Sequence, residues 1–144
     1  MIQAERGPDN RFSANHRLFR RCKKDEVIGD HLTGASISYD NMSTNWSRYS
    51  KPWDVIFDFP NYGIARLRVG DLPDNLPVSQ PPGTPVIPHT FRPQHVPCPE
   101  NYSHTEIWVY KADQRLNRVS ANTVRKEFRQ IISDRSFVIL FPEV

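Results

Sequence analysis

The chain has 144 residues, enough for one domain with a buried core. Its 19 Lys and Arg against 16 Asp and Glu give a net charge of +3, which permits an anionic partner without requiring one. Two cysteines cannot form a disulfide framework, and no apolar run approaches the roughly 20 residues of a membrane span. We therefore expect a cytoplasmic protein that does not bind membranes, and the composition leaves its oligomeric state open.

The first fifteen residues carry no apolar periodicity. Gly7-Pro8-Asp9-Asn10 has the composition of a turn, and no apolar region of a secretion signal precedes it. The sequence predicts a disordered or loosely attached segment over residues 1–15 and a single domain over residues 16–144.

The first ordered segment, Arg17–Cys22, is ambiguous between a strand and a helix. As a strand it places Leu18, Arg20 and Cys22 on one face; as a helix its three apolar residues form one stripe. We favour the strand because the segment is short and lacks a clear cap. Val27-Ile28 is a second short strand or the end of the same hairpin.

A short helix is predicted over residues 53–59, with Ser50 as N-cap and Pro52 in its first turn. The side chains expected to face the core are Trp53, Ile56 and Phe57.

Nine of the thirteen prolines lie between Pro73 and Pro99. Because proline donates no hydrogen bond to a β-ladder, residues 73–102 are predicted to be a long coil in extended polyproline conformation, with short edge pairing at Val86-Ile87. Such a loop is commonly either functional or a covering connection.

Alternation predicts strands over residues 64–69 and 104–111. A second, longer helix is expected from Ser120 to about Ser133, and the apolar run 137–141 predicts a strand buried on both faces. The faces of the 104–111 strand are Thr105, Ile107 and Val109 on one side and His104, Glu106, Trp108 and Tyr110 on the other. These elements predict an α+β fold with a mixed or mainly antiparallel sheet.

Several kinds of site are excluded or disfavoured by spacing. No Gly-rich phosphate loop and no Gly-x-Ser-x-Gly elbow occurs. The side chains His89, His95, Cys98 and His104 supply only one His-x-x-Cys pair, whereas structural zinc sites normally present two close pairs. We therefore predict no metal and no cofactor.

The remaining candidates combine arginine with histidine. Arginine forks bind phosphate or carboxylate, and histidine transfers protons near neutral pH. His104 shares a strand face with Glu106, whose carboxylate could hold the imidazole in one tautomer. The competing interpretation, ordinary surface charges beside an edge-strand histidine, requires no site. The candidates are Arg20, Arg21, Ser43 and Asn101 for ligand binding, and His104 and Glu106 for catalysis.

Three short motifs resemble the pattern of a family of small bacterial domains to which no reaction is assigned. They are Leu18-Phe19-Arg20-Arg21, Asn41-Met42-Ser43 and Pro99-Glu100-Asn101-Tyr102-Ser103-His104, and the resemblance spans residues 17–110. The serine pair that precedes an aromatic residue in that family is reduced here to Ser36-Ile37-Ser38-Tyr39. The resemblance implies that Arg20, Arg21, Ser43 and His104 meet in space.

Two functions fit these residues. The first is a binding or accessory module of a bacterial system, which contacts an anionic ligand (a nucleotide or nucleic acid) or a protein partner through residues 17–24 and the strand of His104. The second is a small nucleotide- or RNA-directed hydrolase that uses Arg20, Arg21, His104 and Glu106. This second hypothesis draws on a similarity to small NAD-consuming toxins, although their Gly-Arg-Trp-Asn signature is absent.

Overall fold

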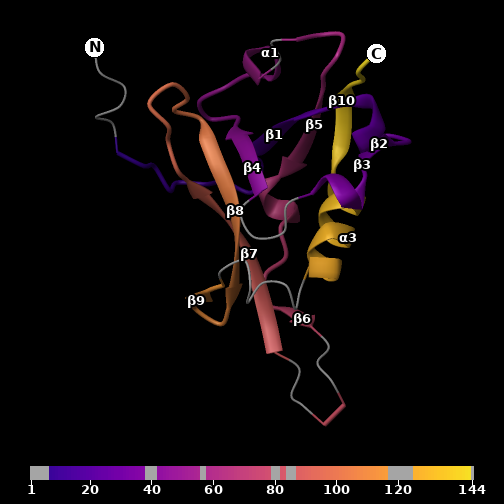
Figure 1. Cartoon of the computed structure of the whole chain (residues 1–144). Helices are drawn as coiled ribbons and strands as arrows, with labels where there is room; N and C mark the ends of the chain where they lie inside the picture. Colours follow the sequence, from indigo (N-terminus) through magenta and orange to yellow (C-terminus); the bar gives the residue numbers. More distant parts are fainter. Residues whose placement is uncertain are drawn as a thin grey trace.

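An eight-stranded antiparallel sheet dominates the fold (Figure 1). The structure is a computed structural model, and it describes residues 7–37, 42–55, 58–78, 82–83, 87–116 and 125–143. The strand order is β10-β5-β1-β4-β8-β7-β6, with β9 paired to β8, and every described pair is antiparallel. The α+β class therefore holds in its coarse form, as a mainly antiparallel sheet with one short and one longer helix.

The bounds of the sheet strands are β1 Arg17–Cys22, β4 Met42–Trp46, β5 Gly63–Arg68, β6 Leu76–Val78, β7 Ile87–His95, β8 His104–Lys111, β9 Gln114–Arg115 and β10 Phe137–Leu140. A separate hairpin consists of β2 Val27–Ile28 and β3 His31–Leu32. The helices are α1 Pro52–Val55 and α3 Arg125–Arg135, and single 3₁₀ turns lie at Lys24–Glu26, Gly34–Ser36 and Val69–Asp71.

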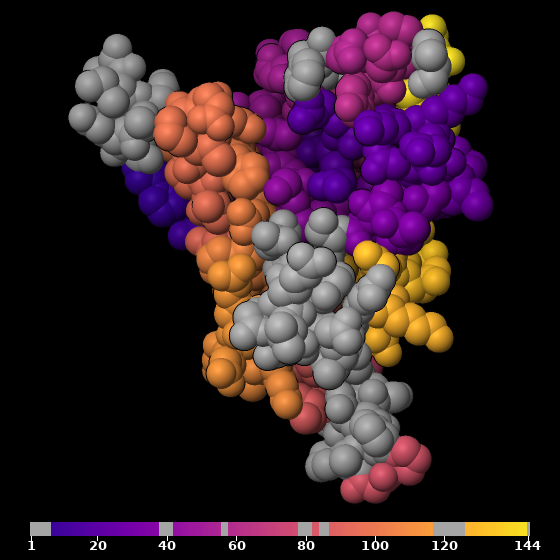
Figure 2. Space-filling view, in the orientation of Figure 1, coloured from indigo at the N-terminus to yellow at the C-terminus, as the bar shows by residue number. Residues whose placement is uncertain are grey.

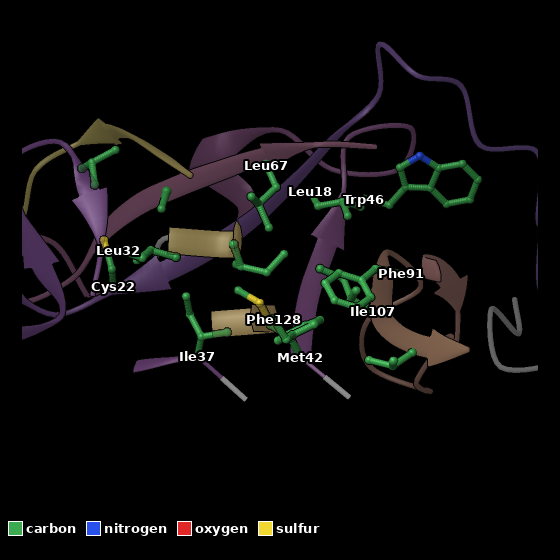
Figure 3. Close-up of a cluster of buried hydrophobic side chains, with 14 of the residues drawn as sticks. Leu18, Cys22, Leu32, Ile37, Met42, Trp46, Leu67, Phe91, Ile107 and Phe128 are labelled. Carbon is green, nitrogen blue, oxygen red and sulfur yellow. The ribbon is translucent and has the colours of Figure 1, made fainter. Parts of the chain in front are cut away.

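The main core lies between one face of the sheet and α3 (Figure 3). Phe128 and Ile132 of α3 are fully buried, and Phe128 packs against Phe91 of β7 with ring centroids 4.7 Å apart. A smaller cluster on the opposite face joins Phe19, Val55 and Ile64. The side chains that point away from α3 therefore form a second face, which is only partly covered by α1.

Three predicted strands are confirmed. Arg17–Cys22 is β1, residues 63–68 form β5, and His104–Lys111 is β8 with the predicted alternation of buried and half-exposed residues. The second helix is confirmed over Arg125–Arg135, whereas its proposed cap at Ser120 lies outside the described residues.

The proline-rich segment is not a coil throughout, so that prediction is wrong for residues 76–78, which form β6, and for residues 87–95, which form the nine-residue strand β7. Of the predicted edge pairing at Val86-Ile87, Ile87 pairs with Val78 of β6, and Val86 lies outside the described residues. The backbone amide of Val96 donates to β8, whereas that of Phe91 donates to the opposite side. Because amides alternate in direction along a strand, Pro93 also faces away from β8, and it lies beyond the three residues that pair with β6. Its missing amide therefore costs no ladder hydrogen bond.

The predicted helix over residues 53–59 is one turn long within the described residues, Pro52–Val55. Trp53 does not face the core, since 68% of its surface is exposed, and Val55 is buried instead. The Ser50 hydroxyl donates back to the Trp46 carbonyl rather than capping this helix. Ile56 and Phe57 lie outside the described residues.

The C-terminal strand is not buried on both faces. β10 is the edge strand of the sheet, and it pairs only with β5 along the order given above. Val138 is buried, whereas the exposed fractions of Phe137, Ile139 and Leu140 are 40%, 38% and 39%. The prediction of burial on both faces is wrong because an apolar run does not show where its strand lies in the sheet.

Residues 7–15 lie against the ends of the strands. The Phe12 ring stacks on the buried Trp46 with centroids 3.9 Å apart, and the backbone amide of Asp9 donates to His95 Nδ1 at 2.8 Å. The division of the chain at residue 15 stays a prediction. None of the helices that the structure describes is long and apolar enough to cross a membrane.

Candidate anion-binding groove

The sheet splits where β1 and β4 diverge. Their ladder contains only Leu18↔Trp46 and Phe19↔Asn45, although the same register would next pair Arg20 with Thr44. Instead, the Arg20 guanidinium spans the gap, donating to the Ser43 carbonyl at 2.8 Å and to the Ser36 carbonyl at 3.4 Å. Arg20 thus replaces backbone pairing with side-chain hydrogen bonds at this point.

A cavity of about 280 Å³ lies at this split. Its lining comes from β1, β4, the start of β8 and the loops beside them. The lining residues are Arg20, Arg21, Glu26, Ser43, Thr44, Asn45, Tyr62, Asn101 and His104. Five of the six residues predicted as site residues are therefore brought together, and Glu106 is not among them.

Two further cavities adjoin the first. One, of about 440 Å³, shares Arg21, Asn45 and Asn101 with it, and the other, of about 490 Å³, shares Tyr62 and is also lined by Lys23 and Lys24. We call the three cavities together the basic groove, after Arg20, Arg21, Lys23 and Lys24 in its lining. The same lining also carries the carboxylates of Asp25, Glu26, Asp54, Asp58 and Glu100, so the groove is not positive throughout. Figure 2 shows the orange lobe of β7 and β8 and the magenta lobe near α1, with indigo and purple atoms of the N-terminal half between them.

Arg20 is a half-buried cation without a neutralising partner. Among the described residues no carboxylate lies within 4.0 Å of its guanidinium, and its two hydrogen-bond acceptors are neutral carbonyls. Burial lowers the pKa of Arg20, and the more distant Glu26 carboxylate acts in the opposite direction. An arginine stays charged in spite of such a shift, so the cavity contains a positive charge that no carboxylate contacts directly.

Tyr62 connects the two basic ends of the groove. The Arg21 guanidinium lies 5.6 Å and the Lys23 ammonium 5.9 Å from the centre of its ring, within the range of cation–π attraction. The ring, which lines two of the cavities, therefore has two cations close to it.

His104 is oriented by the backbone. Its Nδ1 lies 2.8 Å from the Val96 carbonyl and its Nε2 lies 3.3 Å from Ser43 Oγ. A carbonyl only accepts hydrogen bonds, so Nδ1 carries the proton and, in the neutral ring, Nε2 is left as an acceptor for the serine hydroxyl. A hydroxyl and an imidazole in this relation have the geometry of a nucleophile and its base.

Glu106 does not hold His104 in place. Its carboxylate accepts a 2.9 Å hydrogen bond from the indole N–H of Trp108, and the orienting role proposed for it belongs to the Val96 carbonyl. The shared strand face was predicted correctly. Glu106 binds Trp108 of its own strand, whereas His104 binds Val96 and Ser43 on either side of β8.

Asn101 lies in the groove wall, but its amide is used within the protein. It donates to Asn45 Oδ1 at 2.7 Å and accepts from the hydroxyl of Ser103 at 2.7 Å. These bonds fix the turn that precedes β8 against β4, so Asn101 positions the wall of the groove.

Sequence reasoning missed four of the lining residues, Glu26, Thr44, Asn45 and Tyr62. None of them lies in a motif, and each reaches the cavity only because β1 is flanked by β4 and β5 in the sheet. No feature of the sequence distinguished Asn45 and Tyr62 from the other polar and aromatic residues that lie outside the predicted helices and strands.

The histidines considered as metal ligands bind backbone groups. His89 Nδ1 lies 3.0 Å from the Ile87 carbonyl, and His95 is held between the Asp9 amide and the Tyr102 carbonyl. Within the described part of the chain, no three His, Cys, Asp or Glu side chains are grouped so that they could hold a metal ion.

Comparison of the chain with family models, with curated proteins and with solved structures gives no match. The function must therefore be argued from the groove.

Proposed function

We propose that the protein is a binding module that takes an anionic ligand of the phosphate class in the basic groove. The observation that supports this most directly is Arg20, because a half-buried guanidinium that donates only to neutral carbonyls gains most from an incoming anion. Arg21, Lys23 and Lys24 supply further cations, in keeping with the role expected for residues 17–24, although Asp25 and Asp58 line the same cavity as the two lysines.

A phosphate ester fits the groove better than an isolated carboxylate. The cavity beside Arg20 also presents the Ser43 hydroxyl and the His104 imidazole, which supply further polar contacts for an anion with several oxygens. The neighbouring cavities leave room for the rest of a nucleotide-sized molecule, since ligand pockets commonly measure about 300–1,000 Å³.

The test is calorimetric titration of the protein with phosphate, pyrophosphate and mononucleotides. At a ligand concentration of about 100 times the dissociation constant, the free energy of unfolding should rise by about 2.7 kcal/mol. Arg20→Gln should weaken binding about tenfold or more, because hydrogen bonds to charged groups contribute about 1.5–3 kcal/mol.

Arg68→Gln is the matched control, since Arg68 is an exposed arginine of β5 that does not line the groove. Melting curves of both variants verify folding. Wild-type protein that binds none of these anions, or a folded Arg20→Gln protein that binds them like Arg68→Gln, would rule out the groove as the binding site.

A second candidate, hydrolysis of a nucleotide or RNA, is favoured by one observation, the contact between Ser43 and His104. In this version Arg20 and Arg21 hold the phosphate, and His104 removes a proton from the attacking hydroxyl or water. Activated phosphodiesters and short RNA serve as substrates. Loss of turnover in His104→Ala with binding retained would support catalysis. If the wild type and His104→Ala both hydrolyse these substrates only at the uncatalysed rate, binding remains the function.

A further inference from the structure

A cluster of arginine and aromatic side chains lies farther along β8, on the face that also carries His104. We call Arg92, Trp108, Tyr110 and Arg115 the aromatic–arginine patch. The Arg115 guanidinium carbon lies 3.6 Å from the centre of the Trp108 ring, and that of Arg92 lies 4.8 Å from the centre of the Tyr110 ring. Both distances are within cation–π range.

The register interlocks these four side chains. Arg92 of β7 is directly opposite Trp108, and Arg115 of β9 is directly opposite Tyr110, so each arginine neighbours one ring across the ladder and lies over the other. Cross-strand neighbours of this kind share one face of the sheet. The patch is therefore built from three strands.

The polar edge of Trp108 is already satisfied within the protein, because its N–H donates to Glu106. Both arginines are exposed, and among the described residues neither has a carboxylate within 4.0 Å. What the patch offers to a partner is therefore positive charge and the guanidinium groups that lie over its two rings, while the Glu106 carboxylate is engaged by the indole.

The geometry points to single-stranded nucleic acid as the ligand that covers both regions, with a backbone phosphate in the basic groove and bases stacked on the patch. This inference rests on the proposed function and extends it from an anion to a polymer. His104 and Trp108 are four residues apart on β8, roughly 13 Å at the rise of a strand, so a mononucleotide in the groove does not reach the patch.

Stacking on aromatic rings and on guanidinium planes, combined with charge pairing to the backbone, is the usual mode of single-strand binding. A protein partner would instead be expected to meet a desolvated apolar centre. The patch has no such centre, because its rings are covered by cations.

The experiment measures anisotropy of labelled ribo- and deoxyribo-oligouridylate of about ten nucleotides, within the range of about 4–16 nucleotides that single-strand sites occupy. Uridine monophosphate and pyrophosphate are titrated in parallel. The comparison of the two oligomers tests the contribution of the 2′-hydroxyl. Each variant is first compared with the wild type by circular dichroism and thermal melting.

Trp108→Leu is expected to weaken binding of the oligomer about tenfold and to leave pyrophosphate binding unchanged. Arg92→Gln and Arg115→Gln should each lower the salt dependence of oligomer binding, by about 0.7 in the logarithmic slope for every phosphate that is no longer neutralised. Trp53→Leu is the matched control, because Trp53 of α1 is also an exposed ring beneath a cation, with the Lys51 ammonium 5.5 Å from its centre.

The outcomes separate the two proposals. If the oligomer binds no more tightly than the mononucleotide, or if Trp108→Leu binds it like Trp53→Leu, the patch is not a binding surface. In that case, pyrophosphate binding that depends on Arg20 would still support the groove as an anion site. Oligomer binding that depends on Trp108 but not on Arg20 would retain the patch and contradict the joint site. Absence of binding by every probe would overturn both.

Discussion

Asp9 is the most strongly bound carboxylate among the described residues. Its oxygens accept hydrogen bonds from Arg11 Nε at 2.9 Å and from the Tyr49 hydroxyl, and Arg48 Nε lies 3.0 Å from the carboxylate as an ion pair. The hydrogen bonds from Arg11, followed by that from Tyr49, hold the pKa of the Asp9 carboxyl well below its usual range. The ionised Asp9 carboxylate thus joins the N-terminal segment to Arg48 and Tyr49, in addition to the stacking of Phe12 on Trp46.

The first prediction concerns acid stability. In the unfolded chain Asp9 has an ordinary pKa of about 3.9, so its contribution to stability is complete above that pH and is lost as the pH falls toward the lower folded value. We expect Asp9→Asn to be less stable than the wild type near neutral pH and to lose less stability below about pH 4. Urea unfolding as a function of pH measures this, with the exposed Asp113→Asn as control; parallel acid limbs in wild type and Asp9→Asn would contradict it.

The two cysteines differ in burial. Cys22 is fully buried in β1, and burial, together with the nearby Glu26, raises the pKa of its thiol to about 11. Cys98 is half-exposed in the loop before β8, and its pKa is raised as well, mainly by burial. Only Cys98 is therefore accessible to reagents in the folded protein.

We predict that Cys22 in a Cys98→Ser protein is alkylated only as fast as the protein unfolds, whereas Cys98 in a Cys22→Ser protein reacts directly. Because an unfolded thiol has a pKa of about 8.5, the contribution of Cys22 to stability is complete below that pH and falls as the pH rises toward about 11. Mass spectrometry of labelling against time, with and without urea, measures the rates. Equal native-state rates for the two thiols would disprove the assignment.

At the scale of elements, β10 approaches β5 so closely that one position has no room for a side chain. A Cβ on Gly63 would lie 2.1 Å from the Leu140 carbonyl oxygen and 2.6 Å from Pro142 Cδ. Leu140 is also where the register between the two strands shifts. Gly63 therefore fixes how the edge strand joins the sheet.

Gly63→Ala should lower the free energy of unfolding by at least about 1–3 kcal/mol, because the obstructing atoms include backbone that cannot rotate away. Gly34→Ala is the control, since the nearest atom to its added Cβ would be 3.8 Å away. Urea denaturation of both variants provides the comparison. A Gly63→Ala protein as stable as the control would show that β10 can shift without cost.

The elements that could be predicted from the sequence are those whose pattern of apolar and polar residues matches the burial of their side chains in the structure. β8 alternates because one face meets the core and the other does not. β1 was predicted as a strand although it does not alternate in this way, since Leu18 and Phe19 are both buried. β7 was missed because the prediction relied on the number of prolines. Whether Pro93 removes a ladder hydrogen bond depends instead on the direction in which the backbone nitrogen at that position points. β10 was misplaced because its burial depends on strand order.

The candidate site shows the same division. Arg20, Arg21, Ser43 and His104 could be selected because arginine, serine and histidine carry recognisable chemistry, and they do line one cavity. Glu106 could not be excluded from spacing, since only the position of Trp108 determines where its carboxylate binds.

At the scale of the whole molecule, residues 7–15 complete the core of the sheet. They cross from the end of β7 and β8, where the Tyr102 hydroxyl donates to the Gly7 carbonyl, to the end of β5, where Gly70 donates to Ala14. Between these points Phe12 covers Trp46, which has no exposed surface. The N-terminal segment therefore excludes water from the edge of the core.

Phe12→Ala should accordingly destabilise the domain and expose Trp46. A fully buried phenylalanine changed to alanine costs about 3–5 kcal/mol, and since Phe12 is only half-buried we expect about 1–3 kcal/mol. The emission of Trp46 should shift to the red in the folded protein, measured in a background in which Trp53 and Trp108 are replaced. Phe141→Ala is the matched control, because 49% of Phe141 is exposed and its loss should change the free energy of unfolding by less than about 0.5 kcal/mol. If the two variants unfold at the same urea concentration and Trp46 emission is unchanged, the segment lies on the domain without stabilising it.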